Sequence, residues 1–85
     1  MVDFHATWCG PCKRIAPYLH EKCQQHGVIL VKVDVDQNGE ASAKYGIQAM
    51  PTFKVLDSQG NVLLTKTGGA NPVVDEIVGF AASHK

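Results

Sequence analysis

The sequence predicts an α/β protein whose single domain, residues 1–85, contains a mixed four-stranded sheet flanked by helices. Three observations support this class. A β-branched, mostly apolar run covers residues 28–36, which is typical of a buried strand. Segments with helical apolar spacing lie on either side of it along the chain. Two strand-like segments separated by "DSQG" come later. The expected order is strand, helix, strand, helix, strand, strand, helix.

The first part of the chain predicts a strand, a helix and a second strand. Val2 to Ala6 alternates apolar and polar residues, as a short strand does. A helix is expected from Cys9 to Gly27, with Pro11 in its first turn and a kink at Pro17. The run from Val28 to Asp36 is expected to be buried on both faces. Because a helix joins the two strands, they should pair in parallel through a right-handed crossover.

The second part predicts a short helix, a hairpin and a final helix. Asn38 can cap a helix that runs through Tyr45 and stops at Gly46. "TFKVL" and "NVLLTKT" should pair antiparallel around the four-residue loop "DSQG". Asn71 followed by Pro72 is typical of a helix cap and first turn. The apolar face of this last helix comprises Val73, Val74, Ile77, Phe80 and Ala81.

The charge balance and hydropathy argue against several classes of partner. Eight Lys and Arg residues balance eight Asp and Glu residues, so no nucleic-acid surface or membrane-binding basic patch is expected. No apolar run approaches the roughly 18–20 residues that span a bilayer, and no leader precedes the first strand. We therefore expect a cytoplasmic protein, in which a cysteine pair is more often catalytic or metal-binding than structural.

Cys9 and Cys12 form a CxxC pair, a spacing that occurs in zinc sites, structural disulfides and redox sites. A zinc site needs four Cys or His ligands, but no second CxxC or HxxxH is present and Cys23 lies about three turns from Cys12. A structural disulfide closing so short a loop would constrain the unfolded chain very little. Redox exchange fits best, because unpaired N–H groups at a helix start favour a thiolate at Cys9. No metal site is predicted.

The segment "VDFHATWCGPCKRIAP" resembles the active-site segment of thioredoxins, including the WCGPC pentad. The resemblance continues through "VKVDVDQN", "AKYGIQAMPTF" and "KTGGAN" and covers essentially the whole chain. It implies the thioredoxin fold and a protein-disulfide reductase with a Cys9–Cys12 dithiol–disulfide cycle. It also implies that no cofactor is bound, that disulfide-containing proteins are the substrates, and that NADPH supplies electrons through thioredoxin reductase.

The resemblance assigns a role to each catalytic residue. Cys9 matches the nucleophile and Cys12 the resolving thiol. Asp3 matches the family's buried aspartate; burial would raise its pKa and let it accept the Cys12 proton. Lys32 matches the lysine near that aspartate. The alternatives are that Asp3 is a solvated acid at a strand end and that Lys32 is a strand lysine whose charged end snorkels to the solvent.

A substrate-binding surface is also implied. Pro51 matches a proline that thioredoxins hold in the cis form, which would turn the Met50 backbone toward a peptide that pairs as an added strand; the alternative is a trans proline at a strand start. Trp8 and Met50 would supply an adaptable apolar surface. Gly68 or Gly69 would let substrate backbone approach closely, and the sequence does not decide between them.

Gly10 and Pro11, counted with the substrate-binding residues, separate the cysteines as in thioredoxins that mainly reduce. More oxidising relatives carry a His before the second cysteine. Two alternative functions remain open at this point. One is a disulfide isomerase or oxidase-like domain, and the other is a binding module in which the thiols are incidental.

Three features depart from the family pattern. His5 replaces a common aromatic residue and is hypothesised to hydrogen-bond Asp36, the alternative being a half-exposed histidine. Cys23 shares an apolar helix face with Cys12, so it is expected to be buried as a small apolar side chain. The alternative is a regulatory thiol. Thioredoxins usually begin with a further strand and helix, so the Val28–Asp34 strand should have an open edge. That edge predicts dimerisation, exchange of elements or reduced stability.

Overall fold

The computed structural model describes residues 1–84. It contains the seven predicted elements in the predicted order. They are β1 (Val2–His5), α1 (Gly10–Gln25), β2 (Val31–Asp34), α2 (Gly39–Lys44), β3 (Thr52–Leu56), β4 (Val62–Thr67) and α3 (Asn71–Ser83). The strand order in the sheet is β2-β1-β3-β4. β1 pairs with β2 in parallel, whereas β1 with β3 and β3 with β4 are antiparallel, so the predicted mixed sheet is confirmed.

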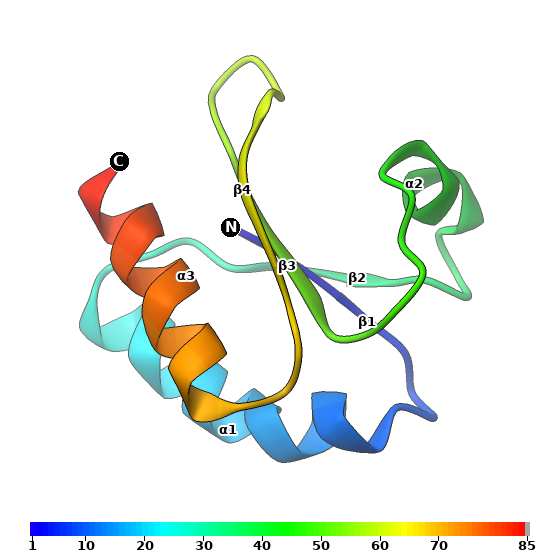
Figure 1. Cartoon of the computed structure of the whole chain (residues 1–85), viewed down its shortest axis with the longest axis horizontal. Helices are drawn as coiled ribbons and strands as arrows, with labels where there is room; N and C mark the ends of the chain where they lie inside the picture. Colours follow the sequence, from blue (N-terminus) through cyan, green and yellow to red (C-terminus); the bar gives the residue numbers. More distant parts are fainter. Residues whose placement is uncertain (85) are drawn as a thin grey trace.

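The helices cover the two faces of the sheet unequally. α1 and α3 pack side by side on one face, and α2 lies on the other side (Figure 1). The core between α1, α3 and the sheet is built from fully buried apolar side chains, among them Leu19, Phe53, Val74 and Ile77. Burying each such side chain contributes about 1.5–3 kcal/mol. This core fixes α1 and α3 against β3 on one face of the sheet.

α1 begins and packs as its sequence predicts. Cys9 is the N-cap in an extended conformation, and Pro11 lies in the first turn. The helix continues through Pro17 as one element. Its buried face consists of Cys12, Ile15, Leu19 and Cys23, with Ala16 half-buried beside them.

The prediction of a long second strand buried on both faces is wrong. β2 spans only Val31–Asp34, and Val31 is exposed. The reason lies in the strand order, because β2 is an edge strand of this sheet and pairs only with β1. β1 likewise ends one residue early, at His5, because the Ala6 carbonyl turns to accept a hydrogen bond from the Cys9 N–H at 3.1 Å.

Both predicted asparagine caps are also wrong. Asn38 occupies the N-cap position of α2, but its side-chain amide donates to the Asp34 carbonyl at 3.1 Å rather than capping the helix. The N-cap of α3 is Ala70, so Asn71 already belongs to the helix. Gly46 follows α2 with φ of 63°, as expected for a glycine that stops a helix.

The predicted hairpin is present, with a loop one residue longer than expected. β3 and β4 pair antiparallel, and residues 57–61 connect them. The Asp57 carboxylate accepts hydrogen bonds from the backbone N–H groups of Gln59 and Asn61. These bonds close the turn and draw Asn61 out of the strand.

Candidate active site

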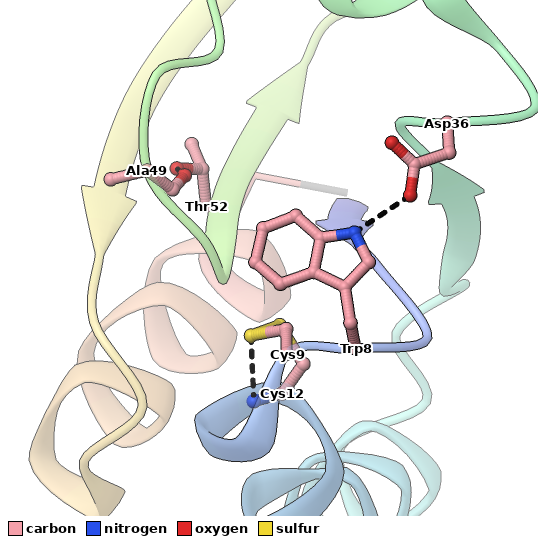
Figure 2. Close-up of a disulfide and its surroundings, with 6 residues drawn as sticks. All are labelled: Trp8, Cys9, Cys12, Asp36, Ala49 and Thr52. Atoms are coloured by element: carbon pink, nitrogen blue, oxygen red, sulfur yellow. Dashed lines mark hydrogen bonds between the residues drawn. A yellow bond between two sulfur atoms is a disulfide. The ribbon is translucent and has the colours of Figure 1, made fainter.

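A disulfide joins Cys9 and Cys12 at the N-terminus of α1, with the two Cα atoms 5.3 Å apart (Figure 2). Both residues are buried. The Cys9 sulfur accepts a hydrogen bond from the Cys12 backbone N–H at 3.2 Å. When the disulfide is reduced, this N–H and the positive end of the helix dipole favour a negative sulfur at Cys9.

Trp8 lies over the disulfide loop with two thirds of its surface exposed (66%). Its indole Nε1 donates a hydrogen bond to Asp36 Oδ2 at 2.8 Å (Figure 2). The hypothesis that His5 binds Asp36 is therefore wrong, since among residues 1–84 the Asp36 carboxylate accepts from Trp8 and makes no hydrogen bond with His5. The bond sets the direction of an exposed aromatic ring beside the two sulfurs.

Asp3 is buried in the middle of the sheet. It lies in register with Lys32 of β2 and Phe53 of β3, and it is 4% exposed. Within the described residues, its Oδ1 atom has no hydrogen-bond partner. Burial raises the Asp3 pKa above that of an ordinary aspartate, and positive charge on His5, Lys32 and His20 opposes this rise. The alternative of a solvated strand-end acid is excluded by this burial.

A pocket of about 390 Å³ lies between this carboxyl and Cys12. Its lining includes Asp3 and His5 from β1, Cys12 and Lys13 from α1, and Lys32 from β2. Lys32 is exposed. Asp3, the predicted base, and Cys12, the predicted resolving thiol, therefore line the same pocket.

The loop before β3 faces the disulfide from the opposite side (Figure 2). The Met50–Pro51 peptide bond is cis, as predicted. Met50 is half-buried and packs against the buried cluster of Ala6, Cys9 and Cys12. The Pro51 carbonyl accepts a hydrogen bond from the Gly68 N–H at 3.0 Å, which ties this loop to the end of β4.

The two neighbouring glycines have separate structural roles. Gly68 has φ of 126°, a conformation that favours glycine. A Cβ atom on Gly69 would lie 2.9 Å from the Pro11 Cβ and 3.2 Å from the Pro11 carbonyl oxygen. Gly69 therefore lets this loop pack directly on the dipeptide between the cysteines.

Residues 1–84 contain neither a metal-binding cluster of side chains nor a helix that could cross a membrane. A metal-binding cluster here means three or more His, Cys, Asp or Glu side chains that could hold one ion, and the described residues contain none. None of the helices described there is long and apolar enough to cross a membrane.

The sequence model of the family described as thioredoxin matches residues 1–82. The chain belongs to the thioredoxin family. A thioredoxin of Bacillus subtilis is 49% identical over 70 residues, which are 80% of this chain and 66% of that protein. A thioredoxin of the sponge Geodia cydonium is 50% identical over 72 residues, 84% of this chain and 67% of that protein.

Solved thioredoxin structures agree with this assignment. The X-ray structure of Fasciola hepatica thioredoxin superimposes with a TM-score of 0.86 at 41% identity, covering 99% of this chain and 78% of that one. A Plasmodium falciparum thioredoxin gives a TM-score of 0.86 at 40% identity, covering 93% and 81%. The matched segment spans about two thirds of the length of the curated thioredoxins.

Sequence reasoning missed two residues of this thioredoxin site. Asp36 is the partner of Trp8, and only its position within "VDVDQN" hinted at a role. Lys13 lines the pocket beside Cys12, and its place directly after the CxxC pair was the available signal.

Replacing Gly69 by alanine is expected to destabilise this thioredoxin by about 1–3 kcal/mol, because the new methyl group overlaps Pro11. The measurement is the free energy of unfolding in denaturant. Gly79→Ala is the matched control: it lies in α3 with open space around it, so it should stabilise by about 0.5–1 kcal/mol. Equal effects of the two substitutions would contradict the close packing at Gly69.

Cys23 is expected to react slowly with iodoacetamide in the native protein. The residue is 3% exposed, and burial raises its pKa, so the reactive thiolate is scarce. Reaction should become rapid only when the protein unfolds, as mass spectrometry of the alkylated protein will report. Rapid alkylation of native Cys23 would instead support the regulatory thiol.

Proposed function

We propose that this chain is a single-domain protein-disulfide reductase of the thioredoxin type. The observation that carries the proposal is the Cys9–Cys12 disulfide at a helix N-terminus, with a buried carboxyl in the pocket beside Cys12. This arrangement supplies a nucleophile, a second thiol to release it and a base. Each of these is needed to pass two electrons to another disulfide.

The first step is attack on the substrate. The Cys9 thiolate attacks one sulfur of a substrate disulfide, so a Cys9–substrate bond forms and the substrate S–S bond breaks. The other substrate sulfur leaves as a thiolate. The Cys12 N–H and the dipole of α1 stabilise the attacking sulfur.

The second step releases the product. Asp3 takes the proton of the Cys12 thiol, directly or through water in the pocket, and Cys12 attacks the Cys9 sulfur. The Cys9–substrate bond breaks, the second substrate thiolate leaves, and the Cys9–Cys12 disulfide remains. Thioredoxin reductase would then return two electrons from NADPH. Lys32, in register with Asp3, would favour the carboxylate form of the base.

The substrate would bind across the surface that surrounds the disulfide. Trp8 supplies an exposed apolar ring, and the half-buried Met50 packs against the buried cluster that contains both cysteines. The other residues proposed for this surface are Gly10, Pro11, Pro51, Gly68 and Gly69. Because reduction requires a reducing environment, the proposed compartment is the cytoplasm.

The test is reduction of insulin by the chain with dithiothreitol as electron source. The wild type should accelerate reduction, and a variant with Cys9→Ser and Cys12→Ser should not. Cys23→Ser is the matched control and should retain activity, because Cys23 belongs neither to the disulfide nor to the lining of the pocket beside Cys12. No acceleration by the wild type would overturn the reductase. Partner binding that survives in the double variant would support the binding module, and reshuffling without net reduction would support the isomerase.

We also propose that the chain dimerises through the free edge of β2. The N–H of Val31 donates to Met1 and that of Val35 to His5, so the backbone groups of Leu30 and Lys32 face away from β1. Ile29 is 81% exposed and Val31 is 51% exposed. An apolar edge with unpaired backbone groups is a template for another strand.

A second copy of the chain fits this edge by antiparallel pairing. With the two Val31 residues facing each other across a twofold axis, Leu30 of one copy lies opposite Lys32 of the other. The pairing stops before Asp34, whose carbonyl already accepts from Asn38.

The test is sedimentation velocity over a concentration series. The wild type should show a dimer, and Val31→Lys should dissociate it by placing two like charges at the axis. Val62→Lys, the same substitution on the opposite edge strand, should leave the dimer intact. A wild-type monomer at every concentration, or dissociation by Val62→Lys alone, would rule out this surface.

A further inference from the structure

His5 lies at the mouth of the pocket that holds Asp3 and Cys12. It is half-buried, whereas Asp3 is almost completely buried. The two residues alternate along β1, so their side chains point to the same face of the sheet. Two residues of a strand span roughly 6.5 Å, a distance at which a charge on one side chain acts on the other.

Among the charged groups around Asp3, His5 has the largest influence on its protonation. The groups that face this carboxyl are His5 on its own strand, Lys32 on β2, and His20, Cys12, Lys13 and Cys23 on α1, while Phe53 on β3 is uncharged. Burial raises the Asp3 pKa, and among the charges that oppose the rise His5 has the largest effect. Asp3 Oδ1, moreover, has no hydrogen-bond partner among residues 1–84. Nearby charge is therefore the main influence that opposes its protonation.

We propose that His5 is a positioning residue for the resolving step, which keeps the Asp3 carboxyl in the ionised form that accepts the Cys12 proton. Positive charge at the pocket mouth compensates for the loss of water around Asp3. The mechanism uses the imidazole charge and needs no contact with substrate. The inference rests on the proposed function for its role in turnover, but its physical core concerns Asp3 and His5 alone.

The test is an NMR titration of the Asp3 carboxyl carbon in the oxidised 85-residue chain, where Cys9 and Cys12 do not titrate. His5→Gln should raise the Asp3 midpoint by roughly half a pH unit or more, because a stabilising charge is lost. His5→Lys, which retains a positive charge, should leave the midpoint at or below that of the wild type. His5→Phe, with an aromatic ring of similar size, should repeat the rise and provides a second neutral variant if His5→Gln is poorly folded.

Lys13→Gln is the matched control. Lys13 lines the same pocket, but it is not among the charges that shift Asp3, so its loss should leave the Asp3 midpoint unchanged. No rise in either neutral His5 variant, or an equal rise in Lys13→Gln, would overturn the proposal. Because this titration involves no turnover, it can fail while the chain still reduces disulfides, and it can succeed while the chain does not.

A kinetic measurement then connects His5 to the resolving step. In His5→Gln, the pH–rate profile of the second thiolate release, which depends on Cys12, should shift to higher pH on its acid side. The shift should equal that of the Asp3 midpoint. The pH–rate profile of the first release, which depends on Cys9, should not shift. A merely structural role of His5 would slow both releases without shifting either profile, and that result would overturn the proposal.

Discussion

Replacing Cys9 by serine is expected to lower the rate of disulfide reduction by about 10³-fold or more, because an alcohol cannot replace the thiolate as nucleophile near neutral pH. Cys9 is the residue at the helix N-terminus, and its sulfur already accepts the Cys12 N–H. The measurement is single-turnover reduction of an aromatic disulfide that releases a coloured thiolate, with Cys23→Ser in every variant.

The comparison with Cys12→Ser makes this result specific. Cys12→Ser should still release the first coloured thiolate and then stop as a stable Cys9 mixed disulfide, which mass spectrometry will detect. The opposite pattern, with adducts on Cys12 and none on Cys9, would exchange the two roles. Equal residual activity in both variants would contradict an ordered two-step cycle.

Replacing Asp3 by asparagine is expected to slow the second coloured-thiolate phase by about 10²-fold near neutral pH, because positioned bases contribute roughly that much. The first phase depends on Cys9 and should change far less. The defect should shrink as pH rises, since Cys12 then ionises without a base. A slowing of both phases by the same factor would contradict the assignment of Asp3 to the resolving step.

The same substitution makes a prediction about stability with a defined sign. Burial raises the Asp3 pKa in the folded state, so the native protein holds this proton more tightly than the unfolded chain does. Its stability therefore falls as pH rises from the ordinary aspartate pKa to the raised value. At pH 8, the free energy of unfolding of Asp3→Asn, measured in denaturant, should exceed that of the wild type by about 1–3 kcal/mol. The difference should vanish near pH 3.5, where Asp3 is largely protonated in both states.

Local patterns in the sequence were sufficient for the element order and for the cysteine pair. Helical spacing from Cys12 to Cys23, glycine at position 46 and the turn sequence after β3 each act over a few residues. The CxxC spacing itself favoured a redox role for Cys9 and Cys12, whereas their disulfide cycle was implied by the family resemblance. The cis peptide before Pro51 followed from the family motif rather than from local physics.

The errors concern features that depend on distant neighbours. The exposure of β2 follows from its place at the sheet edge; the family resemblance predicted that open edge, but the apolar pattern of the run from Val28 to Asp36 indicated a buried strand. The hydrogen bond from Trp8 to Asp36 joins residues 28 positions apart. The sequence alone favoured His5 as the partner of Asp36, but the fold brings Trp8 to this carboxylate instead. The error at Asn38 is local instead: its side-chain amide donates to the Asp34 carbonyl, four residues earlier, and does not cap the helix.

The midpoint potential of the Cys9–Cys12 pair tests the central claim most directly. The full chain would be equilibrated across dithiothreitol ratios while the fluorescence of Trp8, its single tryptophan, is followed. Thioredoxins have a potential of about −270 mV, which is the family's known value and is not calculated from this chain. A single two-electron transition near that value is the predicted result. A midpoint as oxidising as that of protein disulfide isomerase, about −180 mV, or no transition at all, would contradict the reductase.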